Sequence, residues 1–299
     1  MSLWIPVTLA AAFFQTLRFM LQRQLALKTL SATGATFARF LYSAPLVAVC
    51  AVIYLWATGQ EAPQTTWAFW GFGALGGLTQ ILATVCVVML FKERNFAVGI
   101  TFKKTEVIQT VLVGLVLLGE GTSLIGFAAI ALGLVGVLIL SAPPDVSWGW
   151  HSLWNRAAGL GLTSGLLFAF SGVSYRGASL ELGYEDPFAR AAVTLAAVTL
   201  MQMTAMAIWL RVREPGQVRA VWTARRIAVW VGLMSMAGSF CWFTAFTLQN
   251  AAYVNAVGQV ELVLSLLVSL VIFREAISRR EWVGMIILLG SILTLVLAI

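Results

Sequence analysis

Two lone carboxylates, Glu106 and Glu261, lie inside long apolar runs of the sequence. Each is about 10 residues into its run, and a helical rise of about 1.5 Å per residue places it roughly 15 Å deep. An ionisable group at mid-membrane depth is a functional candidate, because burying it in lipid is costly. The pair could bind a polar substrate or exchange a proton, or it could belong to a structural network that joins helices.

Charged and amide side chains surround the two carboxylates in the sequence. Lys103 lies three residues before Glu106, so the two can form an ion pair on one helical face. Glu261 has no cation within one turn, because Gln259 occupies the position that corresponds to Lys104. Glu261 must therefore be protonated, paired with another helix or hydrated.

We expect one cavity near the bilayer midplane to bind the substrate. Gln15 and Arg18 share a helical face that is too polar to meet lipid. Trp242 lies away from the ends of its helix, where it either lines the cavity or packs in the core. The candidate substrate-binding residues are Gln15, Arg18, Gln80, Lys104, Glu106, Trp242, Asn255, Gln259 and Glu261.

Four further charged side chains are candidates for structural or gating roles. Glu120 and Glu275 each follow an embedded carboxylate by 14 residues, just before the next helix. They could cap that helix, form a hydrogen bond across an interface or gate access. Arg39 and Arg190 each end a Phe-Ala-Arg tripeptide near a helix start, where they could tie loop carbonyl groups or attract anionic groups of a substrate.

The elements that position these residues occur twice. Residues 95–140 and 250–295 share residue types at an offset of 155. The matching positions of the first copy are Asn95, Ala97, Glu106, Leu112, Val113, Leu115, Val116, Glu120, Ser123, Leu134 and Leu138. A pattern this long at one offset indicates an internal duplication.

The composition is that of an integral membrane protein. Hydrophobic residues make up 60% of the chain and charged residues only 10%, whereas about a quarter of a soluble domain is charged. The mean hydropathy is +0.91, and the apolar runs have the length of about 20 residues that spans a bilayer as helix. We therefore expect an all-α membrane fold. We assign the +7 net charge to orientation in the lipid bilayer and expect no nucleic-acid partner.

Ten apolar runs predict ten transmembrane helices, at about residues 3–27, 36–57, 67–90, 96–118, 123–140, 157–180, 187–210, 227–248, 252–273 and 281–298. We divide the chain into an N-terminal five-helix repeat (1–141), an inter-repeat loop (142–155) and a C-terminal five-helix repeat (156–299). An odd number of spans per repeat forces the second repeat to insert upside down. Inverted repeats around a central cavity are the structural requirement for alternating access.

The charged links predict the orientation of the chain. Lys and Arg gather in the links after the first, third, fifth, seventh and ninth spans, whereas the intervening links carry Glu61, Glu120, Glu181, Glu185 and Asp186. By the positive-inside rule the basic links are cytoplasmic, which predicts a bacterial inner-membrane protein with both termini in the periplasm.

The sequence predicts neither an enzyme nor a cofactor or metal site. It has no nucleotide-binding motif and no zinc-protease motif, and its only histidine, His151, lies in a loop rich in Trp. The cysteines Cys50, Cys86 and Cys241 lack metal-ligand spacing. Two fused inverted halves could work as a monomer.

These features together resemble the EamA-type carriers of the drug/metabolite transporter superfamily. The resemblance depends on the two five-helix repeats, on the repeated Phe-Ala-Arg, and on an embedded Glu followed 14 residues later by Gly-Glu or Arg-Glu at a turn. Val107 and Leu262 occupy positions at which such carriers often have proline. The residue that favours a local helix break is therefore absent from both copies. The resemblance implies export of small metabolites through a central cavity, and aromatic amino-acid exporters are the most similar subtype.

We therefore expect a secondary transporter that exports an amino acid or a similar small metabolite. The polar cavity residues would bind the carboxylate and the amine, and the apolar walls would accept the side chain. One alternative is a multidrug exporter of lipophilic cations, in which neutralising Glu106 or Glu261 abolishes cation efflux. Another is a membrane scaffold or receptor that transports nothing.

Overall fold

The computed structural model describes residues 2–28, 30–91, 102–141, 156–264 and 278–298, and the regular elements in these ranges are helices. Their bounds are α1 (Trp4–Lys28), α2 (Ala32–Ala57), α3 (Trp67–Leu90), α5 (Glu106–Leu118), α6 (Leu124–Ser141), α8 (Arg156–Leu180), α9 (Pro187–Arg213), α10 (Gln217–Thr223), α11 (Arg225–Leu248), α12 (Ala251–Gly258) and α14 (Arg279–Leu297). The inter-repeat loop 142–155, with His151, and the candidate Glu275 lie outside the described residues.

Seven of the described helices are long and apolar enough to cross a bilayer: α1, α2, α3, α8, α9, α11 and α14. Three shorter apolar segments, Glu106–Leu118, Leu124–Leu140 and Ala251–Leu264, accompany them. A helix of 24 residues is about 36 Å long, which exceeds the roughly 30 Å of a bilayer core. The chain is thus a multi-pass membrane protein, and its regular elements are helices wherever the structure describes it.

Polar side chains set where several helices begin. Ser31, Thr66, Asp186 and Ser278 each accept a hydrogen bond from a backbone N–H in the first turn of the next helix. Such caps satisfy donors that have no partner within the helix. This local chemistry explains why α3 has the predicted bounds. It also explains why α2 begins at Ala32, four residues before its predicted start.

Both embedded carboxylates lie beside an interruption of their helix. The chain turns at Lys104 and Thr105 before α5 begins at Glu106, and it turns at Gln259 before helical residues 260–264. The predicted span 96–118 is therefore not one continuous helix over its described part. The helix is interrupted here without a proline. Backbone groups at the turns form hydrogen bonds to the third residue back instead of the fourth, as in Leu262 N to Gln259 O at 3.0 Å.

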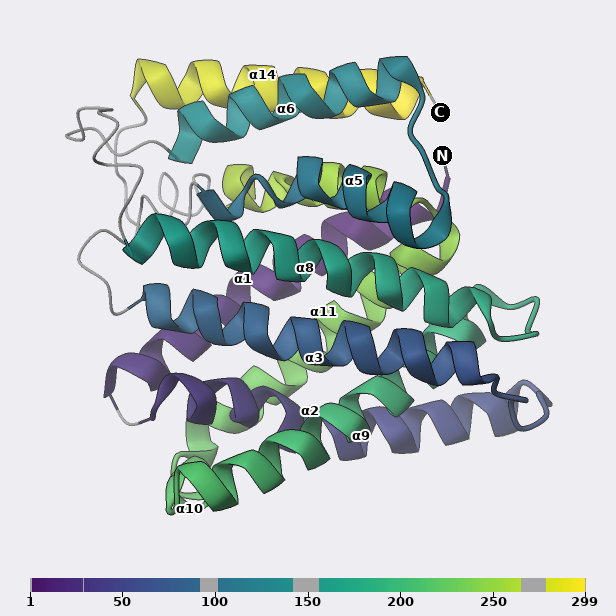
Figure 1. Cartoon of the computed structure of the whole chain (residues 1–299), viewed down its shortest axis with the longest axis vertical. Helices are drawn as coiled ribbons and strands as arrows, with labels where there is room; N and C mark the ends of the chain where they lie inside the picture. The colour runs from purple at the N-terminus through teal and green to yellow at the C-terminus, as the bar shows by residue number, and fades with distance from the viewer. Residues whose placement is uncertain (1, 29, 92–101, 142–155, 265–277, 299) are drawn as a thin grey trace.

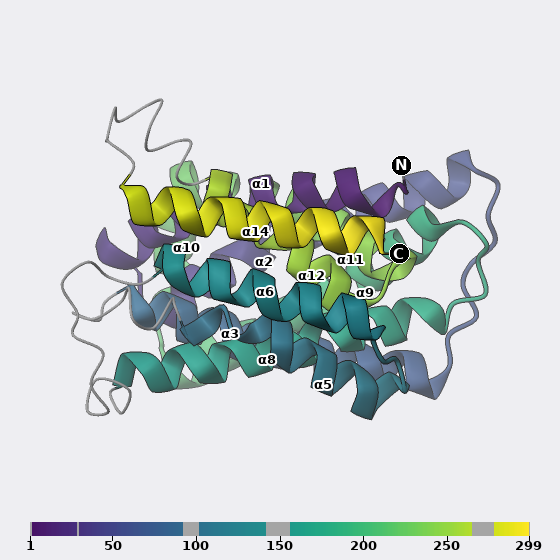
Figure 2. The same ribbon diagram turned by 90° about the horizontal axis from the view of Figure 1, so that it is seen from above.

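Helices of the two halves pack against each other throughout the bundle. The main pairs are α3 with α8, α1 with α11, α2 with α9, and α6 with α14. Figure 1 shows α6 and α14 side by side at one edge and running in opposite directions, and both chain ends lie at the same end of the bundle (Figures 1 and 2).

Glycines permit two of these helix pairs to approach closely. An added Cβ on Gly136 of α6 would lie 3.0 Å from the carbonyl oxygen of Gly284 in α14. On α3, a Cβ at Gly76 would lie 2.7 Å from the ring of Tyr175 in α8. Small residues at such contacts bring backbones together where lipid provides no hydrophobic drive for association.

The segment 211–226, expected to be a basic loop, contains a short helix. α10 follows Gly216, whose φ of 96° favours glycine, and it packs against α2, α9 and α11. Glu214, just before it, accepts hydrogen bonds from Ser31 and Thr33 of the first half. The two halves are therefore tied at this end of the bundle.

Candidate functional site

A cavity of about 50 Å³ lies between helices of both halves. Its lining includes side chains of α1, α2, α3, α8, α11 and α12. Among the residues predicted to bind substrate, those that line it are Gln15, Arg18, Gln80, Glu106, Trp242, Asn255, Gln259 and Glu261. This volume holds a few water molecules.

Lys104 differs from the prediction, because it lines a neighbouring cleft and not this cavity. Its Nζ forms an ion pair with Glu261 Oε1, and Gln15 Nε2 donates to Glu261 Oε2 at 2.9 Å. Of the three states open to Glu261, the structure therefore has the carboxylate paired across helices. Three separate segments of the chain meet at this one side chain.

Glu106 has the local partner expected from its spacing. Lys103 Nζ lies 3.0 Å from Glu106 Oε2, and the same ammonium lies 4.9 Å from the ring centroid of Phe168. Lys103 and Phe168 both line the cavity. The Lys103 side chain therefore serves as an ion-pair partner and as a cation over an aromatic face.

Arg39 is a cavity residue rather than a residue at a helix start. α2 begins two turns earlier, and the Arg39 side chain is only 4% exposed. Its Nε donates to Ser235 Oγ at 2.7 Å and its Nη2 to Ser239 Oγ at 3.0 Å. Arg190, its counterpart in the second Phe-Ala-Arg, instead donates to the carbonyl oxygen of Tyr184 in a loop.

Arg18 is held at the cavity by its own helix. Its Nη1 donates to Gln22 Oε1 at 2.6 Å, and its guanidinium lies 4.2 Å from the ring centroid of Phe19. Gln22 in turn donates to the carbonyl oxygen of Ala35 at 3.1 Å, which joins α1 to α2. Arg18 and Arg39 both line the cavity.

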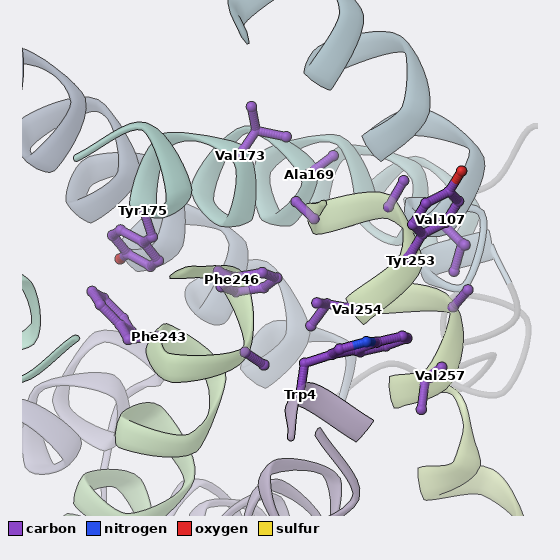
Figure 3. Close-up of a cluster of buried hydrophobic side chains, with 14 of the residues drawn as sticks. Trp4, Val107, Ala169, Val173, Tyr175, Phe243, Phe246, Tyr253, Val254 and Val257 are labelled. Carbon is purple, nitrogen blue, oxygen red and sulfur yellow. The ribbon is translucent and has the colours of Figure 1, made fainter. Parts of the chain in front are cut away.

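Aromatic rings form the apolar wall of the cavity. Figure 3 shows the rings of Tyr175 and Phe243 side by side. Their stacked centroids are 4.2 Å apart, and Trp242 stacks on Phe246 with centroids 5.6 Å apart. Sequence reasoning missed Tyr175, Phe243 and Phe246 as cavity residues. The spacing of Trp242 and Phe246 by four residues, which places both on one helical face, was the available signal.

One glycine makes room for the indole. A Cβ added to Gly258 would lie 2.4 Å from Trp242 Cη2, closer than real side chains approach. Because Gly258 ends α12 beside the turn at Gln259, the helix interruption and the position of the indole are coupled. The aromatic wall thus depends on a residue without a side chain.

Amide side chains connect the cavity to the helices around it. Asn255 Nδ2 donates to Thr110 Oγ1 at 2.9 Å, which joins α12 to α5. Gln259 Nε2 donates to the backbone oxygen of Asn255 at 3.3 Å. On the opposite side, Gln202 Nε2 donates to Gln80 Oε1 at 3.0 Å.

Glu120 joins the two halves and does not cap α6. Arg176 Nε in α8 lies 2.9 Å and 2.7 Å from the two carboxylate oxygens of Glu120. The cap of α6 is Ser123, whose Oγ accepts from Gly126 N at 3.0 Å. Of the roles left open for Glu120, the structure therefore shows the contact across an interface and not the helix cap, since Arg176 engages both carboxylate oxygens.

Comparison with known proteins agrees with this architecture. Among the solved structures that match, one crystal structure has a TM-score of 0.66 at 19% identity, covering 97% of this chain and 99% of that chain. This likeness shows the fold. No curated protein sequence matches the chain.

The fold is that of a multi-pass helical membrane protein with a polar cavity between its halves. A model of the EamA-like transporter family matches residues 155–297 of this chain. This match supports the drug/metabolite transporter superfamily and points to transport of small molecules rather than to an enzyme.

Proposed function

We propose that the protein is a bacterial inner-membrane secondary transporter that exports an amino acid or a similar small metabolite by alternating access. The observation that carries this proposal is the polar cavity shared by the two halves, with Glu261 bonded to Lys104 and Gln15 from the other half. A cavity walled by both halves can open to either side when the halves rock against each other.

The helix contacts favour ten spans arranged as inverted repeats. By order along each half, α1, α2, α3 and α6 correspond to α8, α9, α11 and α14. Exchanging every helix for its counterpart turns the contact α3–α8 into the contact α11–α1, which is also present. The same exchange leaves the contacts α2–α9 and α6–α14 unchanged. The antiparallel course of α6 and α14 (Figure 1) is the relation that a two-fold axis in the membrane plane produces. The three shorter apolar segments would complete ten crossings.

The termini support the proposed orientation. They lie at the same end of the bundle in both views, as an even number of crossings requires (Figures 1 and 2). The opposite end holds α10 with its basic flanks, Arg211, Arg213, Arg225 and Arg226. The positive-inside rule then assigns that end to the cytoplasm and the termini to the periplasm.

The small cavity favours a moving structure over a fixed pore. About 50 Å³ is too small for an amino acid, so a substrate can enter only when the halves separate. The ties between the halves lie at both ends of the bundle: Glu120 with Arg176 at one, and Ser31 with Glu214 at the other. Alternating access would release these ties in turn.

Counterflow into liposomes tests the proposal. Purified protein is reconstituted in liposomes loaded with an unlabelled amino acid, and uptake of the labelled compound is followed for a panel of amino acids, with and without a pH gradient. We expect transient accumulation of at least one member, which empty liposomes do not show. Absence of flux for the whole panel, and for small carboxylates of similar size, would favour a scaffold or receptor.

The charge of the lining counts against an exporter of lipophilic cations. Arg18, Arg39 and Lys103 line the cavity, and its carboxylates Glu106 and Glu261 are both paired with lysines. A cation would meet repulsion without a free acidic partner in the part of the cavity that the structure describes.

A further inference from the structure

The charged groups around the cavity do not balance. Counting the lining and its direct ion-pair partners, the described residues contribute four cations, Arg18, Arg39, Lys103 and Lys104, and two carboxylates, Glu106 and Glu261. The formal excess is therefore two positive charges. Buried charges are stable only when they are paired or well hydrogen-bonded, so the cavity is electrostatically suited to receive negative charge.

The excess resides on the two arginines. Among the described residues neither guanidinium has a carboxylate within ion-pair distance, whereas each lysine has one. Arg39 is bound by the neutral hydroxyls of Ser235 and Ser239, and its Nη1 has no hydrogen-bond partner in the described part of the chain. A buried donor without a partner is energetically costly.

A second hydrogen-bond donor in the cavity lining also has no partner among the described residues. Trp242 Nε1 is buried and has no hydrogen-bond partner within the described residues. Ser239, which binds Arg39, lies three residues before Trp242 on α11, so both face the same side of that helix. One oxygen anion beside this face could accept from the guanidinium and from the indole.

The same surroundings provide a poor site for an ammonium group. Both oxygens of Glu261 are already bonded, to Lys104 and Gln15, and Glu106 is paired with Lys103. An added ammonium would have to displace a lysine from its carboxylate or remain among cations. The amine of an amino acid would therefore weaken binding relative to the same molecule without it.

We propose that the cavity selects net-anionic aromatic carboxylates, with the carboxylate bound by Arg39 and Trp242 and the ring held against Phe243 and Phe246. Arg18 adds positive charge beside this site. The substrate class is then an aryl-alkanoate or an aromatic oxo acid in preference to the zwitterionic amino acid. This inference rests on the proposed transport function and names the substrate class of the same cavity.

Three ligands with one aromatic body test the charge preference. We would titrate purified protein in detergent with 3-phenylpropanoate, phenylalanine and phenethylamine, measuring Kd by calorimetry, and then use each as competitor in counterflow. The expected order of affinity is 3-phenylpropanoate first, phenylalanine second and phenethylamine undetectable. Binding of phenethylamine as tight as that of 3-phenylpropanoate, or no binding of any of the three, would overturn the inference.

Substitutions locate the site. Arg39→Gln should weaken 3-phenylpropanoate binding about tenfold or more, the effect of one charge-assisted hydrogen bond. Trp242→Phe, which removes the Nε1 donor together with one ring of the indole, should weaken it several-fold. Arg190→Gln alters the matched arginine of the second half and should leave the Kd unchanged. If Arg39→Gln does not fold, Trp242→Phe decides alone, and an unchanged Kd for it contradicts the assignment.

The two proposals fail separately. Binding of 3-phenylpropanoate without any counterflow would leave the anion site standing and remove the transport function. Flux of amino acids that 3-phenylpropanoate does not inhibit would support transport and overturn the anion preference.

Discussion

Lys104 and Glu261 form an ion pair between the two halves of the protein, although 157 residues separate them in the sequence. Their side chains are 3% and 13% exposed. Glu106, the counterpart of Glu261 in the first half, is paired with Lys103 of its own segment instead. The duplicated carboxylates therefore have different environments, and only that of Glu261 joins the halves.

Removing one partner of this pair should be more damaging than removing both. Lys104→Met leaves a buried carboxylate without its cation, which costs about 3–5 kcal/mol for a buried pair. The double variant Lys104→Met/Glu261→Gln should recover most of the lost Tm in detergent. Equal Tm values for the single variant and the wild type would show that the pair does not stabilise the fold.

Neutralising Glu120 should loosen the end of the bundle where the termini lie. Glu120→Gln removes the charge of the ion pair with Arg176, which is partly exposed, so we expect a loss of about 1 kcal/mol in unfolding free energy. Glu61→Gln is the control, because among the described residues Glu61 has a bonded backbone oxygen, which accepts from Tyr184, and no bonded side-chain oxygen. Unfolding curves in urea and detergent compare the two variants. If Glu61→Gln lowered the unfolding free energy more than Glu120→Gln, the ion pair of Glu120 with Arg176 would not stabilise this end of the bundle.

Gly258→Ala should displace Trp242 and impair the site. The added methyl would lie 2.4 Å from the indole, so the ring or the end of α12 must move. We expect counterflow to fall by at least about tenfold, because small shifts of binding groups have large effects. Gly290→Ala is the matched control, since its added Cβ meets nothing within 4 Å. Equal rates for both variants would argue against a role for the indole position.

Loss of a serine cap should weaken the start of α14. Ser278 forms a capping box with Glu281, so Ser278→Ala should lower the unfolding free energy by about 1 kcal/mol. Ser123→Ala, at the corresponding place of the first half, should have a similar effect on α6 because Ser123 bonds Gly126 N. Thermal unfolding of the two variants measures the effect. If both variants kept the wild-type Tm, neither serine would stabilise its helix as a cap.

Local features made much of the fold predictable from sequence. Apolar runs of membrane length give the bounds of α3 at 67–90, and the spacing of Lys103 and Glu106 predicts their ion pair. What the sequence could not show are partners across helices: the pairing of Glu261 with Lys104, the position of Arg39 at Ser235 and Ser239, and the use of Glu120 by Arg176. These contacts depend on which helices are neighbours, which no local pattern encodes.

The central claim is that one cavity faces each side of the membrane in turn, and the most direct test is the accessibility of Ser171, which lines it and is 2% exposed. Ser171→Cys is placed in a background with Cys50, Cys86 and Cys241 changed to alanine, and a membrane-impermeant maleimide is applied to right-side-out and to inside-out vesicles. Our account predicts labelling from both sides, slowed by transported substrate. Labelling from one side only under every condition would contradict alternating access.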